Sequence, residues 1–335
     1  MVDNPFFADV DPVPYVHSPD ISPDGTFILF VYAGDVWRVE ADGGRAHPVT
    51  TGPGYDRSPR VSPDGTRVAF TSNRTGNGDI YVLDLKSGNL KRLTYFDGGN
   101  SLGGWSPDGK WLLFSSRRDG LSGGIFKVHL DGGTPIEVFS DPRESQSQSV
   151  FSPDGNRIAF VNDASPFWRR GPLPMPSSIW TLAAEPGSDD FERVTSYAGR
   201  NVNPVWSVED RIFYISDEGG TENVRVAELD GSGVKPITTF EEGRCLGISA
   251  SADGRWIVLD RMAEIWRHDL QSGETSKLDI GLVPDQKVGS SVHRVFSSGL
   301  DDEFHLSPDG KKVLCPNAAQ AAAVLPDQIP CSTTA

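Results

Sequence analysis

One tetrapeptide, Ser-Pro-Asp-Gly, recurs along the chain and limits the possible folds more than any other feature. There are five identical copies, a Ser-Ala-Asp-Gly variant and a decayed Ser-Val-Glu-Asp copy, which begin respectively at Ser22, Ser62, Ser106, Ser152 and Ser307, at Ser251 and at Ser207. In chain order, successive copies lie 40 to 56 residues apart. Repeats of this length are typical of four-stranded propeller blades, and the 3.6-residue apolar period of helical repeats is absent.

The second repeat shows how one unit is built. Residues 59–61 lead into the turn as the innermost strand, and apolar or aromatic runs at 67–72, 79–84 and 90–95 predict three more strands. In the turn, Pro suits a φ of about −65°, Asp accepts hydrogen bonds from nearby backbone N–H groups, and Gly tolerates a positive φ. We therefore expect the aspartates of the motif to be turn residues and not catalysts: Asp24, Asp64, Asp108, Asp154, Asp253 and Asp309.

Six complete repeats predict an all-β fold, a six-bladed β-propeller of four-stranded antiparallel blades, over residues 15–280, plus a partial seventh repeat. The 36 glycines and 25 prolines suit many tight turns. Residues 1–14 form an N-terminal extension, 281–315 a linker and the partial first blade of a second propeller, and 316–335 an irregular tail. No strand is predicted before residue 15, so we expect side-chain packing between the first and last blades to close the ring.

A Pro-rich insertion interrupts the fourth repeat and contains the candidate ligand-binding residues Trp168, Arg169 and Arg170. Long loops on a rigid scaffold often carry function, and Trp and Arg are enriched in recognition sites. Two interpretations are open. The insertion packs over a blade edge, or it projects from the propeller and contacts a partner or a peptide carboxylate.

The sequence contains no convincing catalytic or metal motif. Ser101 and Ser122 each lie in a Gly-x-Ser-x-Gly segment, but both segments join predicted β-strands, whereas a nucleophile elbow needs a strand before it and a helix after it. The six histidines are dispersed, no Cys-x-x-Cys pair is present, and Cys245 is expected to be a buried thiol. No phosphate-loop or dinucleotide motif is found either. We predict no catalytic residue, no metal and no cofactor.

Charge and hydropathy argue against two classes of partner, nucleic acids and membranes. The net charge of −15 argues against nucleic acid as a ligand. No run of about 18 apolar residues could span a membrane, and the first residues lack the basic and apolar regions of a secretory signal. We therefore expect a cytoplasmic protein that contacts neither nucleic acid nor membrane.

The repeat resembles the WD-like propeller repeats of TolB-like proteins and of tricorn-type serine proteases. Five segments favour the tricorn family: 31–37 in the first repeat, 91–96 in the second, 167–170 in the fourth, 210–217 in the fifth and 303–310 at the last copy of the motif. The resemblance covers residues 15–314.

The resemblance implies a six-bladed propeller followed by a seven-bladed one, a PDZ-like domain and a protease core, in large oligomers that degrade oligopeptides in the cytoplasm. The chain ends within the expected second propeller, so no catalytic residue can be carried over. The family's substrate-anchoring basic pair has no match either, because the loop before Trp105 is short and lacks arginine.

We predict a non-catalytic propeller that gates or binds peptides and corresponds to the N-terminal part of a tricorn-like peptidase. Peptides or protein partners are the expected ligands, and a homo-oligomer is consistent with the family. This chain alone is not expected to be an enzyme, whereas its full-length relative would be a serine peptidase. Two alternatives remain: a stand-alone TolB-like scaffold for protein–protein interaction, and a propeller hydrolase with a central metal.

Overall fold

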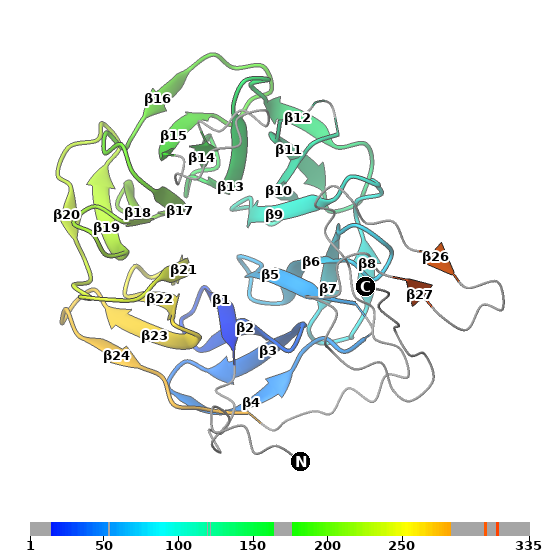
Figure 1. Ribbon diagram of the computed structural model, residues 1–335, viewed down its shortest axis with the longest axis horizontal. Coiled ribbons are helices and arrows are strands. Elements are labelled where there is room, and N and C mark those ends of the chain that lie inside the picture. Colours follow the sequence, from blue (N-terminus) through cyan, green and yellow to red (C-terminus); the bar gives the residue numbers. More distant parts are fainter. Residues whose placement is uncertain are drawn as a thin grey trace. The chain divides into compact units, whose positions relative to one another are not determined.

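The computed structural model describes residues 15–282 except 53, 119, 121 and 164–175, together with the backbone of two short strands at 305–306 and 313–314. The chain divides into two compact units, Met1–Asp285 and Gln286–Ala335. The first contains six antiparallel blades of four strands in a ring, and one of these sheets is extended by a short fifth strand (Figure 1). The predicted all-β, six-bladed propeller is therefore confirmed, and the described residues contain no helix.

Each blade takes its four strands from one continuous stretch of chain. Blade one contains β1 (Val16–Ile21), β2 (Phe27–Tyr32), β3 (Asp35–Glu40) and β4 (Gly43–Pro48); blade two contains β5 (Asp56–Val61), β6 (Arg67–Ser72), β7 (Asp79–Asp84) and β8 (Leu90–Arg92); blade three contains β9 (Asn100–Trp105), β10 (Trp111–Ser116), β11 (Gly124–His129) and β12 (Ile136–Phe139). Blade four contains β13 (Ser145–Phe151), β14 (Arg157–Asp163), β15 (Ser177–Ala183) and β16 (Phe191–Arg193); blade five contains β17 (Asn201–Trp206), β18 (Arg211–Ser216), β19 (Asn223–Glu228) and β20 (Lys235–Pro236); blade six contains β21 (Cys245–Ala250), β22 (Trp256–Arg261), β23 (Glu264–Asp269) and β24 (Thr275–Lys277).

The first strand of every blade, β1, β5, β9, β13, β17 or β21, is the innermost (Figure 1). Because the strands of a blade are antiparallel, the turns between first and second strands all lie on one face of the ring, which we call the turn face. The links from each fourth strand to the next blade lie on the opposite face, the linker face. The axis of the ring is therefore lined by six equivalent strands that run in the same direction.

The hydrophobic core lies between neighbouring blades. One cluster joins Leu29 and Val36 of blade one to Val68 and Phe70 of blade two. Second strands such as β2 and β6 are almost continuously buried, because the blades on either side cover both of their faces.

The Ser-Pro-Asp-Gly turns have the predicted geometry. In blade two the Ser62 hydroxyl donates to Asp64 Oδ1 at 2.5 Å and accepts from the Arg67 N–H at 2.9 Å, while Asp64 Oδ1 also accepts from the Thr66 N–H at 3.0 Å. Gly65 has a φ of 71°. The serine–aspartate bond recurs in blades one, three, four and six, so the aspartates of these five turns are confirmed as turn residues. Asp309 lies outside the described residues.

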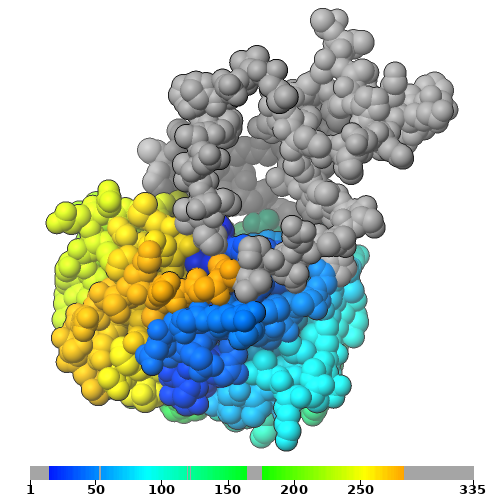
Figure 2. All heavy atoms as spheres, turned by 90° about the horizontal axis from the view of Figure 1, so that it is seen from below, coloured from blue at the N-terminus to red at the C-terminus, as the bar shows by residue number. Residues whose placement is uncertain are grey.

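Ring closure involves more than the expected side-chain packing. Packing is present, since Val16 and Ile28 of blade one cluster with Val258 and Ile265 of blade six. In addition, a short strand, β25 (Ile280–Gly281), pairs in parallel with β4, and the Gly44 N–H donates to the Asp279 carbonyl at 2.7 Å. Figure 2 shows this last described segment, in orange, against blade one, in blue. The expectation was therefore incomplete, because backbone hydrogen bonds also join the two ends of the ring.

In the second unit, β26 (His305–Leu306) and β27 (Val313–Leu314) form an antiparallel pair on either side of the last copy of the turn motif. The assignment of this pair to the first blade of a second propeller remains a prediction. None of the described residues forms a helix of the length and apolarity needed to cross a bilayer.

Candidate ligand-binding funnel

A cavity of about 800 Å³ lies at the axis of the ring and is lined by residues from all six blades. We call it the funnel. Its mouth on the turn face is bordered by the prolines of four turns, Pro23, Pro63, Pro107 and Pro153. Deeper in, it is lined by the first strands, including Ser58, Ser101, Gln148 and Asn203.

In every blade the pairing between the first and second strands shifts in register part-way along the first strand. In four blades a non-glycine residue has a positive φ near this shift: Ser18, Ser58, Gln148 and Asn203, with φ values between 51° and 54°. Such β-bulges bend a strand and redirect its side chains. Beyond the bulge, the residue two positions before the turn serine lines the funnel in every blade, and in chain order these residues are Asp20, Arg60, Gly104, Val150, Val205 and Ser249.

The wall from blades one, two and six is polar. Asp20 is 7% exposed, and its carboxylate accepts from the Val61 N–H at 2.7 Å and from the Ser249 hydroxyl at 3.0 Å. Arg60 Nη1 lies 3.5 Å from Asp20 Oδ1, and its Nε donates to the Gly103 carbonyl at 3.1 Å. Burial raises the pKa of Asp20, and the nearby Arg60 charge and the hydrogen bonds from Val61 and Ser249 partly oppose this rise. Asp20 therefore joins three blades at the axis.

The opposite wall, from blades four to six, combines apolar and polar residues. Six apolar residues that pack on the core of these blades are only partly buried and also line the funnel: Val150, Val205, Trp206, Ile237, Ala250 and Leu270. We call these six side chains the apolar wall of the funnel. Polar and charged residues of the same blades, such as Glu209, Arg211 and Lys235, lie beside it.

Gln148 and Asn203, at the bulges, each use one atom of the side-chain amide in a hydrogen bond to a neighbouring blade and leave the other atom unbonded. Gln148 Oε1 accepts from the Asn203 N–H at 2.8 Å, and Asn203 Nδ2 donates to the Leu246 carbonyl at 2.6 Å. Within the described part of the chain, Gln148 Nε2 and Asn203 Oδ1 have no hydrogen-bond partner. They offer a donor and an acceptor inside the funnel.

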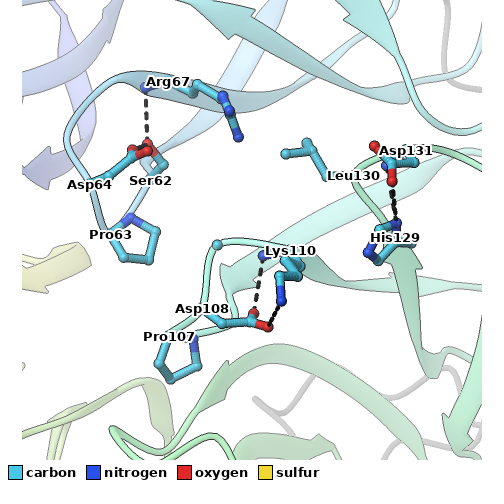
Figure 3. Close-up of a pocket in the computed structure, with 11 residues that line it drawn as sticks. Ser62, Pro63, Asp64, Arg67, Pro107, Asp108, Lys110, His129, Leu130 and Asp131 are labelled. Atoms are coloured by element: carbon cyan, nitrogen blue, oxygen red, sulfur yellow. Dashed lines mark hydrogen bonds and ion pairs between the residues drawn. The ribbon is translucent and has the colours of Figure 1, made fainter.

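A second cavity, of about 580 Å³, lies between the turns of blades two and three (Figure 3). Its basic side chains lie near carboxylates: Lys110 Nζ lies 3.6 Å from Asp108, and His129 Nδ1 lies 3.5 Å from Asp131. Because the charges of this cleft are largely balanced locally, it shows no clear preference for a charged ligand. The funnel is the better candidate site.

Comparison with known proteins identifies the family. Residues 13–274 match the model of the tricorn protease N-terminal β-propeller domain. The chain belongs to the tricorn N-terminal propeller family. The resemblance drawn from the repeats is confirmed.

Relatives and solved structures agree with this family. A tricorn protease homolog of Saccharolobus solfataricus is 29% identical over 281 residues, which cover 82% of this chain and 25% of the relative. Tricorn protease homolog 1 of Streptomyces coelicolor is 30% identical over 277 residues, covering 78% and 24%. The crystal structure of the tricorn protease matches with a TM-score of 0.67 at 22% identity, over 88% of this chain and 28% of that one. This tricorn-type chain spans about a quarter of the length of these curated relatives.

A structure of putative TolB from Agrobacterium tumefaciens also matches, with a TM-score of 0.53 at 20% identity over 79% of this chain and 80% of that one. At this identity the likeness shows the fold alone.

The predicted site residues have different outcomes in this tricorn-type propeller. Trp168, Arg169 and Arg170 lie outside the described residues, so both interpretations of the insertion remain open. Ser101 lies in strand β9, and the Ser122 hydroxyl donates to the Asp141 carbonyl at 3.1 Å, so neither occupies a strand–turn–helix elbow. Cys245 is buried as expected, and burial raises the pKa of its thiol to about 12. No cluster of three or more potential metal ligands occurs among the described residues.

Sequence reasoning missed the funnel residues Asp20 and Arg60. They stand at one register position where the six repeats differ, next to a turn where they agree. That contrast was present in the repeat alignment and could have pointed to the axis.

Proposed function

We propose that this tricorn-type propeller is a non-catalytic module that binds and gates peptides through its axial funnel, as part of cytoplasmic oligopeptide proteolysis. The observation that carries the proposal is the funnel itself, a cavity of about 800 Å³ with polar and apolar walls at the axis of the ring. Its open amides suit the main chain of a peptide, and its width leaves room for side chains. The match to tricorn proteases supports the assignment to proteolysis.

The protease activity would come from another polypeptide or another part of a longer protein. A putative tricorn-like protease C-terminal subunit of Sulfurisphaera tokodaii is 35% identical to this chain over 80 residues, which cover 24% of this chain and 9% of that one. Its name describes a subunit and supports a division of labour between chains. We propose that this propeller assembles with a protease-bearing partner of that kind.

A plugging variant tests peptide binding. A Cβ at Gly104 would lie 3.6 Å from the nearest atoms of Val150, in ordinary contact, so Gly104→Phe should place its ring in the funnel without displacing backbone. Isothermal titration with N-acetylated pentapeptide amides should show binding to the unmodified chain and at least tenfold weaker binding to Gly104→Phe. Asn89→Phe, on an exposed turn outside the funnel, is the control and should bind as the unmodified chain does.

Two outcomes would overturn the proposal. One is peptide binding that Gly104→Phe leaves unchanged, and the other is peptide hydrolysis by this chain alone that a single Ser→Ala change abolishes. The scaffold and metal-hydrolase alternatives stay predictions; stoichiometric calcium or zinc in the purified protein would favour the latter.

A further inference from the structure

We propose that the apolar wall of the funnel, formed by blades four to six, holds an apolar side chain of the bound peptide and makes the propeller selective for branched or aromatic residues. The inference rests on the proposed function and adds to it a preference at a defined wall. The polar wall would face the peptide main chain.

The partly open apolar surface is concentrated on one side of the ring. The core cluster of blades four to six leaves Trp206, Ile237, Ala250 and Leu270 partly buried, and all four line the funnel. The cluster between blades one and six also leaves apolar residues partly open, such as Tyr32 and Trp256, but these do not line the funnel. The asymmetry therefore belongs to the funnel and is not a general feature of the blades.

The funnel extends outward between blades five and six. There its lining reaches Ile237, directly after the outer strand β20, and Leu270, directly after β23. β20 has only two residues, and the turn of blade five has lost both Pro and Gly of the motif. Here Trp206, Ile237 and Leu270 line the cavity. The polar residues Arg211, Lys235 and Gln271 lie next to them in the lining.

The polar groups of the funnel complement a peptide. An extended peptide directs successive side chains to opposite sides, and its main chain carries one donor and one acceptor per residue. Asp20, Arg60 and Ser249 form the polar wall. The open ends of Gln148 and Asn203, which lie on blades four and five beside the apolar wall, can bond the main chain. A small polar side chain would leave the apolar wall uncovered, whereas leucine or phenylalanine would remove apolar surface from water.

The test compares two peptides that differ in one residue, Ac-Gly-Ala-Leu-Ala-Gly-NH2 and the same peptide with Ser in place of Leu. Burial of a leucine side chain corresponds to a difference in affinity of about 10- to 100-fold. We expect the unmodified chain to bind the Leu peptide more tightly by that factor. In the variant Ile237→Ser, the preference should fall to less than threefold.

Val234→Ser is the matched control, because Val234 is on the same blade, is 41% exposed and does not line the funnel. It should keep the preference for leucine. If Ile237→Ser does not fold, as judged by circular dichroism, Leu270→Ala takes its place with the same expectation. If the unmodified chain binds both peptides equally and Gly104→Phe blocks the binding of both, this inference is overturned and the proposed function stands. Absence of binding by any peptide to the unmodified chain would overturn both.

Discussion

The turns and the funnel wall are neighbours in every repeat, but the six repeats agree in sequence at the turns and differ at the wall. Five of the six turns in the ring keep Ser, Asp and Gly at fixed places. Two residues before the turn serine, the wall positions hold Asp20, Arg60, Gly104, Val150, Val205 and Ser249, of which only the two valines are alike. We infer that the residues shared by all the turns are those that each blade needs to fold. The residues that differ between blades at the axis are those that can select a ligand.

The contacts differ in the same way. The bonds of a turn stay within about five residues, as between Ser62 and Arg67. Polar groups near the axis instead join blades: Asp20 contacts blades two and six, and Asp260 of blade six contacts Ser18 of blade one. The bonds of a turn lie within one blade, whereas Asp20 and Asp260 bond neighbouring blades to one another.

The largest expected effect follows from removing a buried carboxylate that joins two blades. Asp260 is 2% exposed and accepts from three backbone N–H groups, those of Ser18, Leu246 and Gly247, at 2.7 to 2.8 Å. Asp260→Ala would leave these donors without partners, so we expect the free energy of unfolding in urea to fall by about 3 to 5 kcal/mol. The matched substitution at a turn, Asp253→Ala, should cost clearly less, and equal losses would contradict the distinction between carboxylates within a turn and those that join blades.

A smaller effect is expected within the turns. The Ser62 side chain is buried and bonds both Asp64 and the Arg67 N–H, so Ser62→Ala should lower the free energy of unfolding by about 1 to 3 kcal/mol. In the decayed turn, Ser207 accepts from the Arg211 N–H at a longer 3.2 Å. Ser207→Ala should therefore cost less than Ser62→Ala in the same urea titration. A larger loss at Ser207 would show that the decayed turn has kept its structural role.

The repeat predicted the fold because its cues are local. Pro, Asp and Gly set each turn from within, and the spacing of the copies gave the number of blades. The closing strand β25 could not be predicted in this way. It has only two residues, and its partners are Gly44 and Arg45, more than 230 residues earlier in the chain. A Cβ at Gly43 would lie 2.6 Å from the Asp279 carbonyl oxygen, so the approach of the two segments requires glycine there.

The funnel could not be predicted from the sequence for a different reason. Trp206 and Leu270 belong to different blades, and their shared cavity exists only once the ring has formed. Sequence reasoning offered the insertion around Trp168 as a candidate binding segment, beside the alternative that it packs over a blade edge, because loops can be recognised without a fold. The axial wall needs both the repeat register and the ring geometry.

The smallest effect is a difference in pH dependence between one wall carboxylate and one turn carboxylate. Burial raises the pKa of Asp20 above its ordinary value of 3.8, whereas the hydrogen bond from Ser62 lowers the pKa of Asp64. The folded state therefore binds a proton at Asp20 more readily than the unfolded state does, and the reverse holds at Asp64. As the pH falls from 7 toward 4, the free energy of unfolding of the unmodified chain should rise relative to Asp20→Asn and level off below 3.8. Relative to Asp64→Asn it should instead fall once the pH drops through 3.8 toward the lowered pKa. Urea titrations at pH 7, 5, 4 and 3 measure both differences, and slopes of the same sign would contradict the assignment of Asp20 to a buried wall and Asp64 to a solvated turn.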